Sequence, residues 1–172
     1  MSAKINSARI PIGGGKMQLQ AGMEAPQFQL ADADMATFSL ASQRGKKNIV
    51  LYFYPKDDTP GCTIEANEFS ALEDDFAALD TQVVGISRDD CLSHASFRDK
   101  YGLSVILLAD TESVACKKYG VLYDKEVDGH KKISVQRSTF VIDKAGKLRH
   151  ALYAVHAHGH AEEILKLIKE IK

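Results

Sequence analysis

Short apolar runs alternate with segments of helical spacing along most of this chain. The run "NIVLYFYP", residues 48–55, ends in proline, and "QVVGIS" and "VILLAD" are similar runs further on. Runs of this length, rich in β-branched and aromatic residues, are typical of strands whose two faces are both buried. We therefore predict three buried strands, separated by segments that are long enough to form helices.

The segment after the first run has its apolar residues at helical spacing. Steps of three and four residues place six of them on one helix face: Cys62, Ala66, Phe69, Leu72, Phe76 and Leu79. The next helix is predicted in "DDCLSHASFRDKYG", with Asp89 or Asp90 as its N-cap and Gly102 as its end. A short helix in "TESVACKKYG" is predicted to be capped by Asp110 and closed by Gly120.

The remaining pattern predicts two hairpins and a last helix. Residues 22–48 suit a β-hairpin followed by a helical turn near residues 40–43. The strands "RSTFVID" and "KLRHALYAV" are joined by "KAG", whose glycine suits a tight turn. Apolar residues between 161 and 171 form one face of an amphipathic C-terminal helix.

The order of these elements predicts an α/β fold. The early strand–helix–strand units favour parallel strands, and the late hairpin favours an antiparallel edge. A mixed central sheet flanked by helices on both faces follows, a layout compatible with a thioredoxin-like fold. We assign residues 17–172 to one domain and residues 1–16, which contain "GGG", to an N-terminal arm with a short edge strand at residues 8–12.

Composition excludes several classes of protein. The formal net charge is −1, which does not favour nucleic acid or an anionic membrane as a partner. No apolar run approaches the roughly 20 residues of a membrane span, and the N-terminus lacks the apolar core of a signal peptide. Three cysteines, an odd number, do not resemble a secreted disulfide framework. We therefore expect a cytoplasmic protein whose cysteines rest as thiols.

Cys62 lies at the junction between the first buried strand and the helix that follows it. Unpaired N–H groups and the positive end of the helix dipole stabilise a thiolate at such a place. Pro55 ends the strand, Thr59 supplies a hydroxyl, and Pro60–Gly61 makes a tight turn. A single cysteine on an apolar helix face is more often a buried small hydrophobe. The run "PKDDTPGC" before the helix favours a reactive thiol instead.

The stretch "YFYPKDDTPGCTIEANEF" resembles the peroxiredoxin signature Pro-x-x-x-Thr-x-x-Cys, and more narrowly the peroxiredoxin Q group, also called bacterioferritin comigratory proteins. The likeness runs from about Met17 to the C-terminus through "VVGISRDD", "SHASFRDKYGL", "LLADTES", "KKYGV", "RSTFVIDKAGK" and "GHAEEIL". It implies a thioredoxin-like (peroxiredoxin) fold and the reduction of hydrogen peroxide and organic hydroperoxides, with no metal and no organic cofactor.

The resemblance also implies roles for individual residues. It makes Cys62 the peroxidatic cysteine, which peroxide oxidises to a sulfenic acid. Thr59 would hydrogen-bond the peroxide, and Pro55 would shield the thiolate. Arg137 would lie beside the thiolate, in a position that Glu65 orients. Arginine suits this place because it stays charged and offers a rigid fork of donors to the charge that develops on the leaving oxygen.

The sequence departs from its relatives at the second, resolving cysteine. Asn67 stands five residues after Cys62, where many of the group carry that cysteine, and Arg98 stands at the alternative place in the next helix. Cys91 remains a possible resolving cysteine, whereas Cys116 is the weaker candidate. We expect one-cysteine behaviour, with thioredoxin, glutaredoxin or glutathione as the external reductant, in a protein that the resemblance implies is a monomer.

Three other functions are alternatives to the peroxiredoxin hypothesis. The histidines of "HAHGH", with His150 nearby, could hold a metal, although a solvated loop is the plainer interpretation. A dithiol oxidoreductase would need a cysteine three residues after Cys62, where Glu65 stands. A redox sensor or chaperone-like protein could use Cys62 as a switch with little turnover, and the missing resolving cysteine keeps this alternative open.

Overall fold

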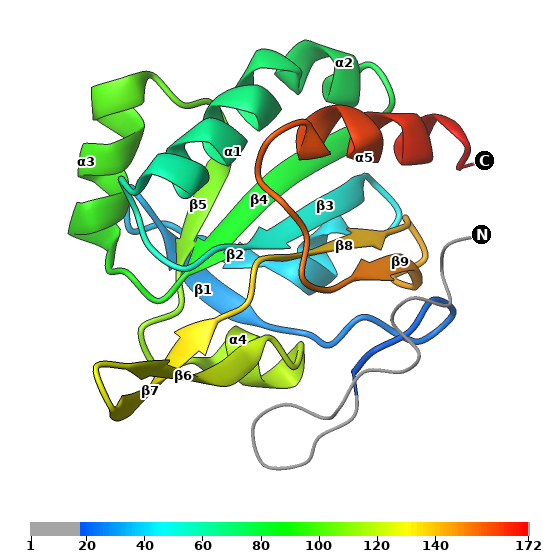
Figure 1. Cartoon of the computed structure of the whole chain (residues 1–172). Coiled ribbons are helices and arrows are strands. Elements are labelled where there is room, and N and C mark those ends of the chain that lie inside the picture. The colour runs from blue at the N-terminus through cyan, green and yellow to red at the C-terminus, as the bar shows by residue number, and fades with distance from the viewer. Residues whose placement is uncertain (1–17, 172) are drawn as a thin grey trace.

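The computed structural model describes residues 18–171, which form a mixed α/β structure (Figure 1). Its strands are β1 (Gln29–Asp32), β2 (Thr37–Ser39), β3 (Asn48–Phe53), β4 (Thr81–Ser87), β5 (Ile106–Ala109), β6 (Leu122–Val127), β7 (His130–Val135), β8 (Ser138–Ile142) and β9 (Leu148–Leu152). Its helices are η2 (Leu40–Gln43), α1 (Pro60–Ala71), α2 (Glu73–Ala77), α3 (Cys91–Tyr101), α4 (Val114–Lys118) and α5 (His160–Lys169). The predicted arm at residues 1–16 and its strand at residues 8–12 lie outside the described residues.

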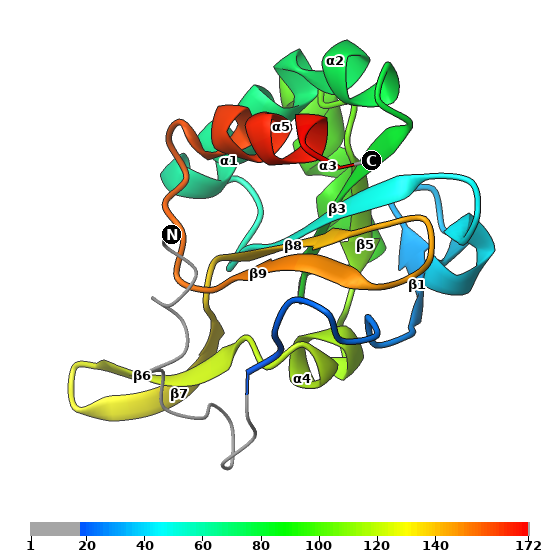
Figure 2. The ribbon, with the colours of Figure 1, turned by 90° about the vertical axis from the view of Figure 1, so that its right-hand side faces the viewer.

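Seven of the described strands form one sheet in the order β2-β1-β5-β4-β3-β8-β9. β3 pairs parallel with β4, and β4 with β5, whereas β8 pairs antiparallel with β3 and β9. α1, α2, α3 and α5 cover one face of the sheet, and α4 lies on the other (Figures 1 and 2). The predicted mixed sheet with helices on both faces is therefore confirmed.

β3 is buried along its whole length, as its continuous apolar run predicts. Val50 and Tyr52 join the core beneath α1 and α5, whereas Ile49, Leu51 and Phe53 join the core on the side of α4. Successive side chains of a strand point to opposite faces, so both faces must be apolar when helices cover both. β3 is followed by the turn that precedes Cys62.

The predicted long helix after this turn is interrupted. α1 ends at Ala71 and α2 begins at Glu73, because Leu72 between them leaves helical geometry with φ −102° and ψ 12°. Phe69 and Phe76 nevertheless both remain buried. The spacing therefore identified the side that packs on the core, where Leu72 and Leu79 are half-buried, but not the break.

Helix caps follow the prediction closely. The Asp90 carboxylate accepts a hydrogen bond from Ser93 N at the start of α3, and Gly102 ends this helix with φ 64°. Asp110 caps α4, since its carboxylate accepts hydrogen bonds from Ala115 N at 3.2 Å and Cys116 N at 2.8 Å. Side-chain caps of this kind satisfy N–H groups that the helix itself leaves unpaired.

The hairpin of β6 and β7 was not predicted. It forms a separate two-stranded sheet that projects from the side of the molecule that carries α4 (Figure 2). Asp128 and Gly129 make its turn with φ values of 53° and 78°. An Asp-Gly pair with two positive φ values is a common hairpin turn, so the sequence did carry a local signal. β7 leads directly to Arg137, one residue before β8.

Within residues 18–171, none of the helices combines the length and the apolar character that crossing a membrane requires.

Candidate active site

Cys62 is the third residue of α1, and its side chain is almost fully buried. Pro60 is the first residue of the helix and Thr59 is its N-cap residue, but the Thr59 side chain does not cap it. The Thr59 hydroxyl instead donates to Lys56 O at 2.9 Å. Because the Thr59 side chain does not cap this end of α1, the positive end of its dipole remains available to an anion at the sulfur.

Arg137 connects Cys62 to a buried carboxylate. Its Nη2 lies 3.5 Å from Cys62 Sγ and its Nη1 lies 2.6 Å from Glu65 Oε1. Burial lowers the pKa of the Arg137 guanidinium, but the neighbouring Glu65 and Cys62 raise it, and the net change is upward. A permanent positive charge therefore lies at hydrogen-bond distance from the sulfur, and a thiolate is the form that it favours.

Glu65 has an unusual protonation equilibrium. Its side chain is fully buried, and burial raises its pKa to about 7 although Arg137 acts in the opposite direction. One carboxylate oxygen accepts from Arg137, whereas within the described residues Oε2 has no hydrogen-bond partner. A carboxylate with one unpaired buried oxygen is costly to ionise, which agrees with the direction of this shift.

Gly61 leaves the room that the Arg137 guanidinium uses. A Cβ atom at position 61 would lie 3.0 Å from Arg137 Nη2 and 3.9 Å from the Ala157 methyl. Val155 N also donates to Arg137 O at 2.9 Å, so the segment before α5 borders the same site. The short turn predicted from Pro60–Gly61 thus allows an arginine to approach the start of α1.

The site residues predicted from the sequence lie on two segments of the chain. Thr59, Cys62 and Glu65 belong to the turn and first turns of α1, and Arg137 precedes β8, next to β3 in the sheet. Pro55 is exposed and follows β3, seven residues before Cys62. Direct contacts join Cys62, Arg137 and Glu65.

The other cysteines differ in their surroundings, and all three are free thiols. Cys91 is half-buried at the first residue of α3. Cys116 is fully buried in α4. Burial is the main cause that raises the pKa of its thiol, and the Asp110 carboxylate raises this pKa further. Asn67, at the place where the resemblance leads us to expect a second cysteine, is exposed on α1.

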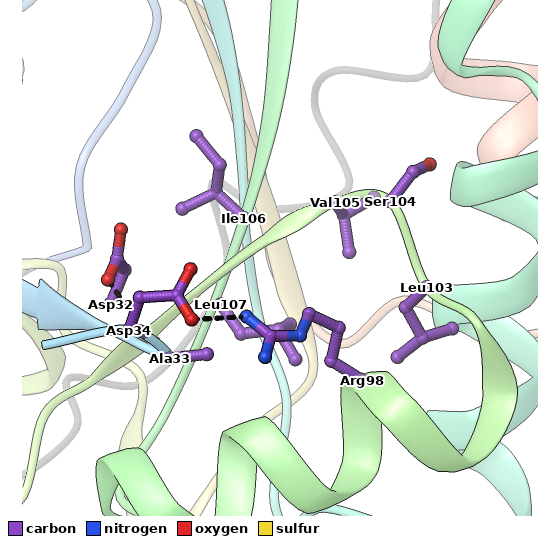
Figure 3. Close-up of a pocket in the computed structure, with 9 residues that line it drawn as sticks. All are labelled: Asp32, Ala33, Asp34, Arg98, Leu103, Ser104, Val105, Ile106 and Leu107. Carbon is purple, nitrogen blue, oxygen red and sulfur yellow. Dashed lines mark hydrogen bonds and ion pairs between the residues drawn. The ribbon is translucent and has the colours of Figure 1, made fainter. Parts of the chain in front are cut away.

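Arg98, the alternative place for that cysteine, has a surface role in this chain. Its Nη1 pairs with Asp34 Oδ1 at 3.0 Å, and its Nε pairs with Asp99 Oδ1 at 3.0 Å. Figure 3 shows Arg98 directed from α3 toward Asp34 at the edge of a cavity of about 190 Å³. None of the residues that line this cavity belongs to the Cys62 site.

The histidines of residues 156–160 lie in different surroundings. His160 is buried and its Nε2 lies 2.8 Å from Thr139 Oγ1, whereas His158 is exposed and lies 3.2 Å from Glu68. Among residues 18–171, ligand-type atoms of three side chains come together elsewhere, at Asp57, Asp89 and His94.

That second group was missed by the sequence analysis. Asp57 lies two residues before Thr59, and His94 lies on α3 with its Nδ1 2.7 Å from Asp57 Oδ2. Both residues are buried. The signals were the doubled aspartate of "PKDDTPGC" and a histidine on the buried face of "CLSHASF", but neither points to the other without the fold.

Comparison with known proteins agrees with this fold and site. The AhpC/TSA family profile matches residues 21–151. The chain therefore belongs to the AhpC/TSA family, whose members include the peroxiredoxins. It is 42% identical to a putative peroxiredoxin bcp of Helicobacter pylori, over 87% of this chain and 97% of the relative. It is 37% identical to peroxiredoxin Bcp of Bacillus subtilis, over 90% and 98%.

Similarity to solved structures indicates to which group of peroxiredoxins the chain is related. A mutant of Xylella fastidiosa PrxQ superposes with a TM-score of 0.83 at 32% identity, covering 90% of this chain and 98% of that one. The bacterioferritin comigratory protein of Xanthomonas campestris, described for its alkyl peroxide reduction activity, gives 0.81 at 32% identity, over 87% and 97%. The fold is thus thioredoxin-like, and the chain is a peroxiredoxin of the Bcp or Q group, a thiol-dependent peroxidase that uses a thioredoxin-type reductant.

Proposed function

We propose that Cys62 is the peroxidatic cysteine of this peroxidase and that Arg137, Glu65, Thr59 and Pro55 form its site. The observation that carries the proposal is the 3.5 Å contact between Arg137 Nη2 and Cys62 Sγ, at a helix start that the Thr59 side chain leaves uncapped. A cation and a helix N-terminus both favour the thiolate, which is the reactive form of a cysteine. In this proposal Pro55, between β3 and this turn, shields the thiolate and shapes the pocket.

In the chemical step the Cys62 thiolate attacks the terminal oxygen of the peroxide. An S–O bond forms as the O–O bond breaks, so the sulfur is oxidised to a sulfenic acid and the peroxide is reduced. The leaving oxygen takes up a proton and departs as water or an alcohol. Arg137 and the N–H of Cys62 stabilise the charge that builds on that oxygen. Because the Thr59 hydroxyl donates to Lys56 O, its oxygen is free to accept a hydrogen bond from the peroxide.

We propose that an external thiol restores Cys62, as thioredoxin, glutaredoxin or glutathione would. A first thiol displaces water from the sulfenic acid and forms a mixed disulfide, and a second thiol releases the Cys62 thiol. Two features support this route. Asn67 and Arg98 occupy the places where the resemblance leads us to expect a second cysteine, and Cys91 begins a different helix, α3, from the one that carries Cys62.

The experiment is stoichiometric oxidation followed by intact-mass and peptide analysis. One equivalent of hydrogen peroxide should add one oxygen to Cys62, in a form that a sulfenic-acid reagent traps. Loss of two hydrogens without dimerisation would instead mean that Cys91 or Cys116 resolves Cys62. Turnover is then measured with thioredoxin, glutaredoxin and glutathione separately. Rapid oxidation of Cys62 without turnover on any donor would favour a redox sensor over a peroxidase cycle.

We also propose a cytoplasmic monomer whose domain, residues 17–172, folds without residues 1–16. The large apolar side chains exposed in residues 18–171 belong to several different elements, which supports the monomer. Light scattering of the reduced protein should give the mass of one chain.

The domain boundary and the location need separate tests. A variant that lacks residues 1–16 should keep its melting temperature and its rate of reaction with peroxide. Cell fractionation tests the cytoplasmic location.

A further inference from the structure

The loop between β3 and α1 is attached to α3 by two consecutive aspartates. Asp57 is buried, and its carboxylate is contacted by Tyr54 Oη at 2.6 Å, Ser93 Oγ at 2.8 Å and His94 Nδ1 at 2.7 Å. Asp58 is exposed and accepts hydrogen bonds from Lys100 Nζ and Tyr101 Oη at the other end of α3. The residues that precede Thr59 therefore have their positions set by a helix that does not contribute to the Cys62 site.

His94 is the buried anchor of this attachment. It is fully buried, and its Nε2 lies 2.9 Å from Leu108 O, the carbonyl of a residue in β5. A carbonyl oxygen only accepts, so Nε2 carries a hydrogen and donates it. Nδ1 then faces the Asp57 carboxylate, and one further proton lies in that contact. The imidazole thus joins the catalytic loop to the middle of the sheet.

The loop needs this support because its backbone is strained. Asp58 has φ 58°, a left-handed conformation that costs a residue other than glycine free energy. The Thr59 hydroxyl closes the same turn by donating to Lys56 O. Asp57 lies inside this turn, so the direction in which the Thr59 oxygen presents its lone pairs depends on how firmly Asp57 is held.

We propose that Asp57 and His94 are positioning residues of the Cys62 site, which hold Thr59 in the orientation that accepts a hydrogen bond from the peroxide. A buried ion pair is weak evidence for stability, since apolar residues of the same volume often serve as well, but it does fix geometry. The inference rests on the roles proposed above for Cys62 and Thr59. It adds two residues that never touch the peroxide.

A metal site is the rival explanation for this group. Ligand atoms of Asp57, Asp89 and His94 lie within 4.8 Å of one another. However, each side chain already has hydrogen-bond partners: Asp89 Oδ2 accepts from Ser87 Oγ at 2.6 Å and from Asp57 N at 2.8 Å. The group is thus a satisfied hydrogen-bond network, and it continues through Asp57 into the catalytic loop.

Two substitutions of His94 separate its two contacts. The amide nitrogen of His94→Asn can occupy the place of Nδ1 and keep the bond to Asp57, whereas that of His94→Gln can occupy the place of Nε2 and keep the bond to Leu108 O. Both variants lose the imidazole, so they are matched in what they remove from the core. Only the glutamine variant releases the loop.

The measurement compares two reactions of Cys62 in each variant. Hydrogen peroxide needs the Thr59 hydroxyl, whereas alkylation by iodoacetamide needs only the thiolate. We expect His94→Gln to slow oxidation about 10- to 100-fold and to change alkylation less than about twofold, because small misplacements of a positioning group carry large rate penalties. His94→Asn should recover most of the oxidation rate. Equal losses in both reactions, or equal losses in both variants, would overturn the proposal.

A double-mutant cycle with Thr59→Val identifies the route of the effect. If His94 acts through Thr59, His94→Gln should slow oxidation little in a protein that already lacks the hydroxyl. Additive losses would contradict this. If His94→Gln does not fold, Tyr54→Phe provides the test, because it removes a single hydrogen bond to Asp57. It should lower the ratio of the oxidation rate to the alkylation rate of Cys62 about twofold to fivefold. An unreactive wild-type Cys62 would refute the peroxidase assignment, whereas a reactive one with an unchanged ratio in the variants would refute only the positioning role.

Discussion

Cys62 and Cys116 occupy equivalent positions in two different helices. Each is the third residue of its helix, and each side chain is almost completely buried. The groups around the two sulfurs differ in charge. Arg137 contacts Cys62, whereas the Asp110 carboxylate lies beside Cys116, accepts its backbone N–H and contributes to the raised pKa of its thiol. A helix start and burial are thus common to both, whereas the neighbouring charges have opposite signs.

This difference explains why position in a helix is a poor predictor of thiol reactivity by itself. At α1 the N-cap side chain leaves the helix N–H groups unpaired, and a cation adds to the dipole. At α4 a carboxylate already occupies the same N–H groups, and its negative charge disfavours a second anion. The same local geometry therefore gives one thiol suited to nucleophilic attack and one suited to packing.

The largest expected effect comes from removing each sulfur in turn. Cys62→Ser should lower peroxide consumption by at least about 1,000-fold, since it removes the proposed nucleophile. Cys116→Ala should keep the rate and cost about 1 to 2 kcal/mol of stability through lost packing. Peroxide consumption and thermal unfolding of both variants provide the check. Near-normal consumption by Cys62→Ser would remove the basis of the comparison.

Removing the cation should have the next largest effect. Arg137→Met is expected to slow oxidation of Cys62 about 100- to 1,000-fold, because a fixed donor is lost where charge develops. Arg137→Lys keeps the charge without the fork that also reaches Glu65, so its rate should lie between those of the methionine variant and the wild type. Rates are measured by quenched-flow mass analysis. A methionine variant as fast as wild type would mean that the helix start alone activates the thiol.

Glu65 should give the protein a distinctive dependence of stability on pH. Its pKa is about 7 in the folded protein and 4.5 as an ordinary glutamate. Between these values the unfolded chain loses the proton while the folded protein keeps it, so the free energy of unfolding falls as pH rises and levels off above pH 7. The fall is on the order of 3 kcal/mol.

Glu65→Gln isolates this contribution. The variant should lack the loss of stability that Glu65 causes between pH 4.5 and 7, so its free energy of unfolding relative to wild type should rise across this range. Urea unfolding at several pH values measures the difference. A difference that stays constant with pH would show that Glu65 is already ionised, and paired with Arg137, at pH 5.

The smallest expected effect concerns the carboxylate beside Cys116. Asp110→Asn keeps one oxygen that can cap α4 but loses the second acceptor oxygen and the negative charge at the helix start. The protein should therefore lose about 1 kcal/mol of stability, or about 2 to 4 °C in melting temperature. Peroxidase activity should not change. Oxidation of Cys116 by peroxide in the native variant would show that removing one charge is enough to make this second thiol reactive.

Sequence patterns identified the buried strands and the helix caps because each of these depends on local features. The apolar run of β3 and the N-cap Asp90 lie within a few residues of what they predict. The break at Leu72 was not visible, since apolar spacing continues through it. The β6–β7 hairpin was missed although Asp128–Gly129 marks its turn, because its strands are mostly exposed and lack a strong apolar pattern.

The site itself was only partly accessible from the sequence. The resemblance paired Arg137 with Cys62, 75 residues apart, which no local pattern could have done. The contact between Asp57 and His94 joins residues 37 positions apart through the packing of α3 on the sheet. A buried histidine looks like any core residue in sequence, and only the fold reveals which loop it holds.

Gly61 has no side chain, and this limits how the protein can change by mutation. A methyl group there would lie 3.0 Å from the Arg137 guanidinium, so even alanine would compete with the arginine for the same space. Steric access to the sulfur and the electrostatic field around it are therefore not independent traits. Selection for a wider or narrower entrance at this turn also changes the charge that the sulfur experiences, and the two properties must evolve together.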